Sequence, residues 1–304
     1  MALFSIVVAL IIEQIRPLAQ QRYVREPLSR YARFLDERFN DGQQRHGTIA
    51  WLIALLPAVL LMLALQILLD RYQPLLALLL NVAVLYLTMG FRQFSHFFTD
   101  IHIALRTGDI GRARAVLGEW RGRSAERLSS QEVARLAIEE ALLASHRHVF
   151  APLLCFILLG PAGAVLYRLA LFFKAQWGML DSVPFGEMAR RAFFMIDWLP
   201  LRFTAAAFAM VGDFEDAVFC WRTQAGNWPD ASSGILLASG AGAVGVRLGQ
   251  PIHEVGEIVE RPEIGIGEEA DTDFMQSTIG LVWRSLVLCL LLLALFWVAS
   301  WVGH

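Results

Sequence analysis

The chain has 304 residues, of which 56% are hydrophobic and only 18% are charged, and its net charge is −2. Soluble domains carry about 25% charged residues, so this composition, with a mean hydropathy of +0.50, favours a membrane protein. A nucleic-acid partner is excluded, because binding to phosphates requires a concentrated basic surface.

The first third of the chain predicts a helical hairpin across the bilayer. Residues Ile49–Leu69 are uncharged and match the about 20 residues that cross a hydrocarbon core of about 30 Å. A polar turn at 70–74 separates them from a second apolar stretch, Leu75–Phe91. The apolar segment 1–15 is short for a span, and its orientation stays open. Residues 16–48 are rich in arginine, so the positive-inside rule predicts that they are cytoplasmic.

Residues 92–148 are predicted to form amphipathic cytoplasmic helices embedded in the membrane domain. Apolar residues such as Val133, Ala137 and Ala141 recur there at helical spacing among charges. Ser129 and Glu132 have the spacing of a capping box at the start of one such helix.

Three further apolar stretches follow, and one of them predicts a span. Val149–Phe173 is the third predicted span, with a kink and close packing expected at Gly160-Pro161-Ala162-Gly163. Residues 185–211 are weaker, because charges interrupt them and Pro200 is expected to break the helix. Residues 232–248 are rich in Gly and Ala, which favours tight packing over membrane insertion.

The end of the chain predicts an acidic surface loop at 250–275 and a fourth span at Ile279–Val302. The predicted fold class is therefore an all-α, polytopic membrane protein with about four to five transmembrane helices plus amphipathic cytoplasmic helices. Residues 1–304 are predicted to form one domain in a bacterial inner membrane. Lipid is the expected partner, and a protein partner or a homo-oligomer is also consistent with the glycines in the spans.

Several common chemistries lack their sequence patterns. The single lysine, Lys174, follows Phe173, so no phosphate loop ending in Gly-Lys-Ser or Gly-Lys-Thr exists. The glycine pattern at 240–245 is better explained by close helix packing than by dinucleotide binding. His146 and His148 are either neutral polar residues at a membrane interface or members of a metal or acid-base site. The three cysteines, Cys155, Cys220 and Cys289, are too far apart to predict a metal site or a disulfide.

Asp197 is the most unusual position, because it places a carboxylate inside an apolar stretch beside Trp198. Acids within a membrane are functional candidates by default, since an unpaired charge there is costly. The alternative is a structural pair in which Arg202 or Arg191 neutralises Asp197.

The chain resembles the CobD/CbiB superfamily in a series of blocks spread over about 150 residues. These blocks are Gly108-Asp109-Ile110-Gly111-Arg112-Ala113-Arg114, Ala151-Pro152-Leu153, Gly163-Ala164-Val165-Leu166-Tyr167-Arg168, Phe185-Gly186, Asp197-Trp198-Leu199-Pro200-Leu201-Arg202 and Gly245-Val246-Arg247-Leu248-Gly249. Their charged residues give the candidate ligand-binding set Asp109, Arg112, Arg168, Arg202 and Arg247.

The resemblance implies a specific activity and also a departure from it. The cobalamin members are membrane-bound synthases that join an aminopropanol-type group to adenosylcobyric acid in an amide bond, using ATP and magnesium. Here the family's acid pair is replaced by Phe193-Phe194, and among the aligned acids only Glu139 is kept. Glu139 and Asp197 are therefore the catalytic candidates, no metal-ligating residues are predicted, and no cofactor is expected unless the chain uses ATP and magnesium as a synthase.

The lost acids favour a non-catalytic relative with a regulatory, sensing or ligand-binding role in cell-envelope signalling. Met1-Ala2-Leu3-Phe4 and the block from Asp197 to Arg202 look closest to the AmpE branch, a group of regulatory inner-membrane proteins. The first alternative is a divergent adenosylcobinamide-phosphate synthase. A third hypothesis, a transporter, depends on Asp197 and the expected break at Pro200.

Overall fold

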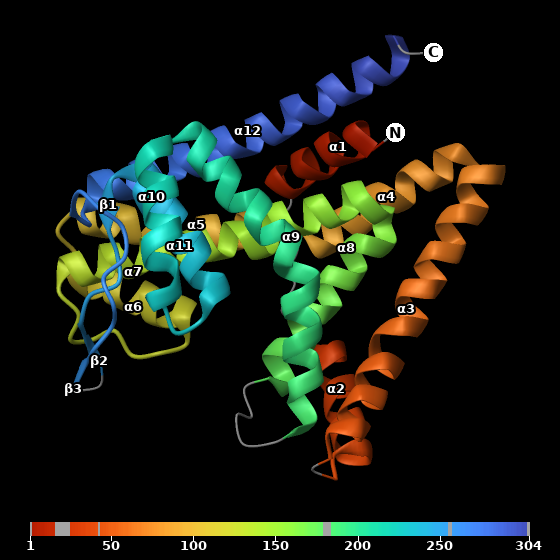
Figure 1. The fold of residues 1–304 in the computed structure, drawn as a ribbon, viewed down its shortest axis with the longest axis horizontal. Helices are drawn as coiled ribbons and strands as arrows, with labels where there is room; N and C mark the ends of the chain where they lie inside the picture. The colour runs from red at the N-terminus through yellow and green to blue at the C-terminus, as the bar shows by residue number, and fades with distance from the viewer. Residues whose placement is uncertain (1, 16–24, 42, 179–183, 255–256, 303–304) are drawn as a thin grey trace. The chain divides into compact units, whose positions relative to one another are not determined.

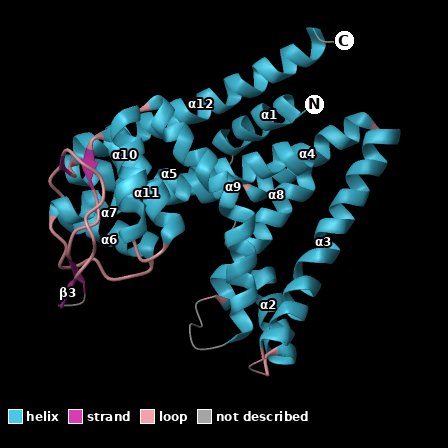
Figure 2. Cartoon of the chain, in the orientation of Figure 1, coloured by secondary structure: helices cyan, strands magenta, loops and turns pink. Residues whose placement is uncertain are grey.

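The computed structural model describes residues 2–15, 25–41, 43–178, 184–254 and 257–302. Nearly all of these residues are helical, and strands are confined to a few short pairs (Figure 2). The chain divides into two compact units. Unit 1 comprises residues 1–90 and 147–200, and unit 2 comprises residues 91–146 and 201–304. The predicted all-α fold class is confirmed.

Unit 1 is built from the helices at the start and in the middle of the chain (Figure 1). They are α1 (Ala2–Ile15), α2 (Glu26–Phe39), α3 (Gln44–Tyr72), α4 (Pro74–Thr88), α8 (Ala151–Trp177), the 3-10 turn η3 (Pro184–Gly186) and most of α9 (Glu187–Val211). Residues 16–24 of the basic segment 16–48 lie outside the described residues.

The two predicted helices are present as α3 and α4, but only α3 is long enough to be a candidate span. Gln73 caps the end of helix α3, and Pro74 occupies the first position of α4. Proline lacks a backbone N–H, and an N–H at this position would have no acceptor within the helix. The predicted end at Phe91 is wrong, because α4 stops at Thr88 and Met89 is extended. Phe91 instead begins the next helix, so α4 has only 15 residues.

Aromatic residues fill the core of unit 1. The ring of Trp177 lies 4.6 Å from that of Phe173 and 5.3 Å from that of Phe185. The amphipathic helix α2 buries Ala32 and Leu35 in the same cluster and turns its charged residues away from it. The packing of these side chains against one another helps to hold the helices of unit 1 together.

The predicted kink in α8 is confirmed at Gly160, which has φ 64° and ψ −157°. Only glycine adopts this backbone conformation without strain, and Pro161 beside it removes one helical N–H. A side chain on Gly160 would also overlap the amide of Gln66 from α3. The kink is therefore a point of close approach between two apolar helices.

Unit 2 surrounds one central helix, α7 (Ser130–Ser145), whose residues are almost all buried. Its other elements are α5 (Phe91–Arg106), α6 (Ile110–Arg121), α10 (Phe214–Gln224), the 3-10 turn η4 (Ala225–Asn227), α11 (Ala231–Val244) and α12 (Thr272–Val302), with strands β1 (Val246–Arg247), β2 (Ile252–Glu254), β3 (Glu257–Val259) and β4 (Glu268–Glu269). Helices α5, α6, α11 and α12 pack around α7. A π-helical turn, η2 (His146–Phe150), continues the chain from α7 into α8.

Two local predictions for unit 2 are confirmed. The Ser129 hydroxyl accepts a hydrogen bond from the Glu132 N–H at 3.2 Å, and the Glu132 carboxylate accepts one from the Ser129 N–H at 2.6 Å, which completes the capping box. The glycine pattern at 240–245 is helix packing, because a side chain on Gly242 would overlap the backbone of Asp216.

The acidic segment 250–275 is more ordered than the predicted loop. Strands β2 and β3 pair antiparallel with Ile252 opposite Val259, and β1 pairs parallel with β4. The prediction missed these strands because each has only two or three residues, too few for an alternating pattern to show.

Within the described residues, four helical stretches are long and apolar enough to cross a membrane, namely Gln44–Tyr72, Ser130–Trp177, Pro184–Val211 and Thr272–Ala299. Two of them contain the predicted spans 49–69 and 149–173, and a third covers all but the last three residues of the predicted span 279–302. The fourth corrects the prediction of a broken helix, because α9 continues through Pro200. The stretch 130–177 has 48 residues, more than twice the about 20 that a bilayer needs, and its charged part is α7. The membrane-crossing part is therefore α8.

The side chains of α3 need lipid around them, since only 11% of its most apolar window is buried within the protein. Exposed leucines such as Leu60, Leu61 and Leu68 would form an apolar surface far larger than soluble monomers carry. The chain is a multi-pass membrane protein.

Replacement of Gly47 by alanine is expected to destabilise the protein by about 1–3 kcal/mol, because the new methyl group would overlap the Phe185 carbonyl oxygen. Gly280→Ala is the matched control, since Gly280 is also helical and has open space at this position. Alanine favours a helix over glycine by up to about 1 kcal/mol, so the control should be neutral or stabilising. Equal thermal unfolding temperatures for both variants in detergent would contradict the close approach.

Candidate functional site

A stripe of charged residues runs along α7, the buried helix at the centre of unit 2. Glu132, Arg135 and Glu139 lie at spacings that place them on one helix face, and their exposed fractions are 7%, 8% and 5%. Buried charges are costly unless they are paired or hydrogen-bonded, so each must find partners. The segment that follows α11 supplies most of these partners.

Glu132 joins the start of α7 to strand β2. Besides the capping box, its carboxylate accepts hydrogen bonds from the backbone N–H of His253 at 2.9 Å and from the His253 imidazole at 2.9 Å. Burial raises the pKa of Glu132, but the hydrogen bonds from Ser129 and His253 outweigh it and lower that pKa to about 2. Glu132 is therefore ionised at neutral pH.

Arg135 binds the chain just before β2. Its guanidinium donates to the side-chain oxygen of Gln250 and, at 3.0 Å, to the carbonyl oxygen of Pro251. Gln250 has φ 60°, a left-handed conformation that is unusual for a residue other than glycine. The local backbone is thus strained where it meets Arg135.

Glu139 completes the stripe. One carboxylate oxygen accepts a hydrogen bond from the Gly249 N–H at 2.9 Å, and the other pairs with Arg261. Arg261 also lies over the ring of Trp228, at 5.0 Å from its centroid. Glu139 is thereby enclosed, which gives it a structural role in fixing the segment 249–261 on α7.

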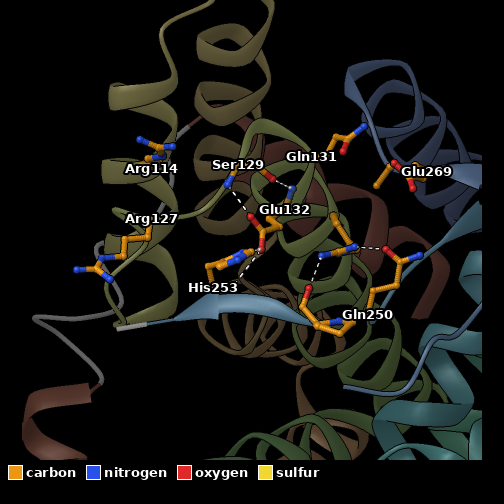
Figure 3. A pocket seen from close by; sticks show the side chains of 11 residues that line it. Arg114, Arg127, Ser129, Gln131, Glu132, Gln250, His253 and Glu269 are labelled. Carbon is orange, nitrogen blue, oxygen red and sulfur yellow. Dashed lines mark hydrogen bonds and ion pairs between the residues drawn. The ribbon is translucent and has the colours of Figure 1, made fainter. Parts of the chain in front are cut away.

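A polar cavity of about 450 Å³ opens beside this stripe (Figure 3). It is lined by Arg114, Arg127, Ser129, Gln131, Glu132, Arg135, Gln250, Pro251, His253, Glu269 and Ala270. Figure 3 shows Arg114 and Arg127 on one side of Glu132 and Glu269 on the other. Its size and polar lining suit a small charged ligand, and it is the candidate functional site.

None of the seven sequence-predicted site residues lines this cavity. In unit 2, Asp109 caps α6 by accepting the Arg112 N–H at 2.9 Å, and the Arg112 side chain is exposed. Arg247 lies 3.9 Å from Glu269, a cavity residue, and Glu139 lies one turn beyond Arg135. Arg202, on α9, is half-buried.

The remaining predicted residues belong to unit 1. Asp197 is 4% exposed and accepts a hydrogen bond from the Tyr167 hydroxyl at 3.0 Å. The Arg168 guanidinium lies 2.7 Å from Nδ1 of His148. Arg191, one of the two predicted partners of Asp197, forms an ion pair with Glu187. The two catalytic candidates, Glu139 and Asp197, thus fall in different units.

Sequence reasoning missed the cavity arginines, although one signal pointed to them. Charged residues at 132, 135 and 139 interrupt the apolar face of α7 in one line, which marks a buried polar stripe and not a solvated surface. The other lining residues come from distant segments, and only the fold brings them together.

The described residues do not offer a ready-made magnesium site. No three His, Cys, Asp or Glu side chains gather closely enough in the described part of the chain to hold a metal ion. The Glu132 carboxylate already accepts three N–H groups, and His146 bonds to Thr204 at 2.9 Å. A magnesium ion that arrives with a nucleotide would take most of its ligands from phosphates and water.

Substitution of Glu132 by glutamine is expected to destabilise unit 2 by about 1–3 kcal/mol at pH 7, because the amide NH₂ would face N–H donors. The wild-type carboxylate contributes stability above its unfolded pKa of about 4.5, and this contribution is lost as the pH falls toward about 2. The difference between wild type and variant should therefore shrink below about pH 4.5. Denaturant unfolding at several pH values measures it, with the exposed Glu126→Gln as control. A difference that stays constant with pH would contradict the ionised state of Glu132.

Comparisons with known proteins found one family model and several relatives that match most of the chain. The family model described as "CobD/Cbib protein" matches residues 7–282. "Cobalamin biosynthesis protein CobD" of Stutzerimonas stutzeri (strain A1501) is 33% identical over 295 residues, which cover 95% of this chain and 96% of that protein. The protein of the same name from Chromobacterium violaceum is 37% identical over 215 residues, or 70% of this chain and 69% of the relative.

A more distant relative carries the other family name. "Cobalamin biosynthesis protein CbiB" of Salmonella typhimurium is 26% identical over 239 residues, which cover 74% of this chain and 73% of that protein. No solved structure matches the chain. The family model spans both units and the polar cavity, so the predicted resemblance is confirmed, and the chain belongs to the CobD/CbiB family.

Proposed function

We propose that this chain acts in cobalamin biosynthesis as a membrane-bound ligase that forms an amide bond with the use of ATP. The observation that carries the proposal is the family match over residues 7–282, together with relatives whose names state cobalamin biosynthesis. Such names favour the synthase alternative over the AmpE-like regulatory role that the lost acids suggested. The bacterial inner membrane remains the proposed location.

Amide formation with ATP defines what the site must do. A carboxylate oxygen first attacks the terminal phosphorus of ATP, and ADP leaves with the electron pair of the bond that breaks. The amine lone pair then attacks the carbonyl carbon of the acyl phosphate. The bond from that carbon to the phosphate oxygen breaks, phosphate leaves with the electron pair, and the nitrogen loses a proton. The protein must therefore stabilise phosphate charge and accept one proton.

His253 is the proposed proton acceptor. Its side chain is 60% exposed and lines the cavity, and its Nδ1 lies 2.9 Å from the Glu132 carboxylate. An ionised carboxylate can only accept, so Nδ1 carries a hydrogen, and in the neutral form of the imidazole the free lone pair is then on Nε2. This pairing of a histidine with an orienting acid is a common arrangement for a general base. Glu132 acts on the reaction only through His253, as a positioning residue.

Binding of the same ligands without turnover is the second candidate function. It is favoured by Phe193, which stands in place of a family acid and packs at 5.6 Å from the ring of Tyr167. Phenylalanine neither binds magnesium nor donates to a nucleotide. The ligase proposal therefore assigns the reacting surface to the cavity in unit 2 and not to this part of α9.

Substitution of His253 by glutamine should lower the rate of amide formation by about 10²–10⁴-fold, the usual contribution of a general base. The assay uses the full chain in lipid nanodiscs with adenosylcobyric acid, aminopropanol phosphate, ATP and magnesium, and measures product by mass spectrometry. His96→Gln is the matched control, since His96 is exposed on α5 outside the cavity.

Two outcomes would contradict this assignment. Full activity of His253→Gln would remove His253 from the reaction. A wild-type protein that binds the substrates but makes no product would overturn the ligase proposal and support the second candidate.

A further inference from the structure

Arg135 is a buried cation whose direct partners are neutral. It is only 8% exposed, and its guanidinium donates to the Gln250 amide oxygen and the Pro251 carbonyl oxygen. Its Nε has no hydrogen-bond partner in the described part of the chain. A buried guanidinium normally pairs with a carboxylate, because neutral acceptors compensate only part of the cost of its burial.

The acids near Arg135 are engaged by other residues. Glu139 pairs with Arg261, and Glu132 accepts from Ser129 and His253. Glu269 lies 3.9 Å from Arg247. These carboxylates act on Arg135 only at longer range, while its burial lowers its pKa. The positive charge at the cavity wall therefore lacks a direct counter-charge within the described residues.

Two more arginines face the same cavity, and neither has an acid partner among the described residues. Arg114 uses its Nε to donate to the Leu128 carbonyl oxygen at 2.7 Å, which leaves its two terminal nitrogens for other acceptors. Arg127 is exposed at the cavity wall, and no ion pair involves it among the described residues. Arginines hold phosphates well, because their planar N–H groups match two oxygens at once.

The cavity also includes the first turn of α7. The capping box occupies the N–H groups of Ser129 and Glu132, whereas those of Ser130 and Gln131 have no acceptor within the helix. The start of a 16-residue helix favours a negative charge. The strained backbone of Gln250 holds the other wall beside Arg135, as expected for a site shaped before its ligand binds.

We propose that this cavity binds a phosphate-type oxyanion, with Arg135 as the buried counter-charge and Arg114 and Arg127 at the rim. The inference rests on the proposed function only in using the same cavity, since binding of an anion requires no turnover. Phosphate oxygens could come from a nucleotide, a soluble phosphomonoester or a lipid headgroup, and the three share the recognition chemistry described.

The test is a calorimetric titration of inorganic phosphate into the full chain in phosphatidylcholine nanodiscs. Arg127→Gln is expected to weaken binding about tenfold or more, as loss of a charge-assisted hydrogen bond does. Arg106→Gln, an exposed arginine at the end of α5, is the matched control for the change in charge and should bind as wild type does.

A second variant should change affinity in the opposite direction. Glu269→Gln removes a negative charge from the cavity wall, so phosphate is expected to bind several-fold more tightly. If Arg127→Gln and Glu269→Gln only disturbed the structure, both variants would bind phosphate more weakly than wild type does. Absence of wild-type binding, or equal affinities for wild type, Arg127→Gln and Glu269→Gln, would overturn the proposal.

Competition identifies the source of the phosphate. Displacement of bound phosphate by ATP, by glycerol phosphate or by phosphatidylglycerol in the nanodisc would assign the site to a nucleotide, a phosphomonoester or a lipid, respectively. Displacement by succinate with equal strength would overturn the preference for phosphate. Phosphate binding without any amide product would support the anion site and contradict the ligase proposal. Product formation with equal phosphate affinity in wild type and variants would support the ligase and contradict the anion site.

Discussion

The cost of burying charge organises unit 2. Three ionisable side chains on α7 lie almost fully inside the protein, and the segment after α11 folds onto them because it carries their partners. Two of the three, Glu132 and Glu139, are satisfied by N–H groups and by a cation or an imidazole. The third, Arg135, is met only by neutral oxygens. The same constraint thus fixes the short strands, shapes the cavity and leaves it positively charged.

The sequence predicted most of the fold because bilayer spans and helix caps are local signals. Length and apolar content located α3, α8 and α12, and the spacing of Ser129 and Glu132 located the start of α7. The predicted helix boundaries were wrong where the same residues fitted two different interpretations. An apolar residue such as Phe91 fits a span and an amphipathic helix equally well, and the charges around Pro200 hid a helix that other helices stabilise. The strands of the acidic segment depend on α7 for their order, so no local pattern could reveal them.

The candidate site was predicted poorly for a related reason. Family blocks pointed to residues that cap helices or pair within one unit, such as Asp109 and Glu139. The cavity arginines come from α6, the loop before α7 and α7 itself, and only packing brings them into one wall. Whether a charged residue is buried without an acid beside it is a property of the folded chain. The spacing of charged residues along the sequence does not reveal whether one of them is buried without an acid partner.

The contact between Gln66 and Gly160 has a consequence for how α3 sits in lipid. Residues 56–69 of α3 are almost uniformly aliphatic, so turning this part about its long axis would exchange one leucine surface for another at little cost. Gln66 is the exception, because its amide fits against the side-chain-free backbone of the kinked helix. Rotation would move that amide away from Gly160 and empty the space that it fills between the two helices, which costs packing energy. One polar side chain thus fixes how this aliphatic part of α3 is rotated about its own axis.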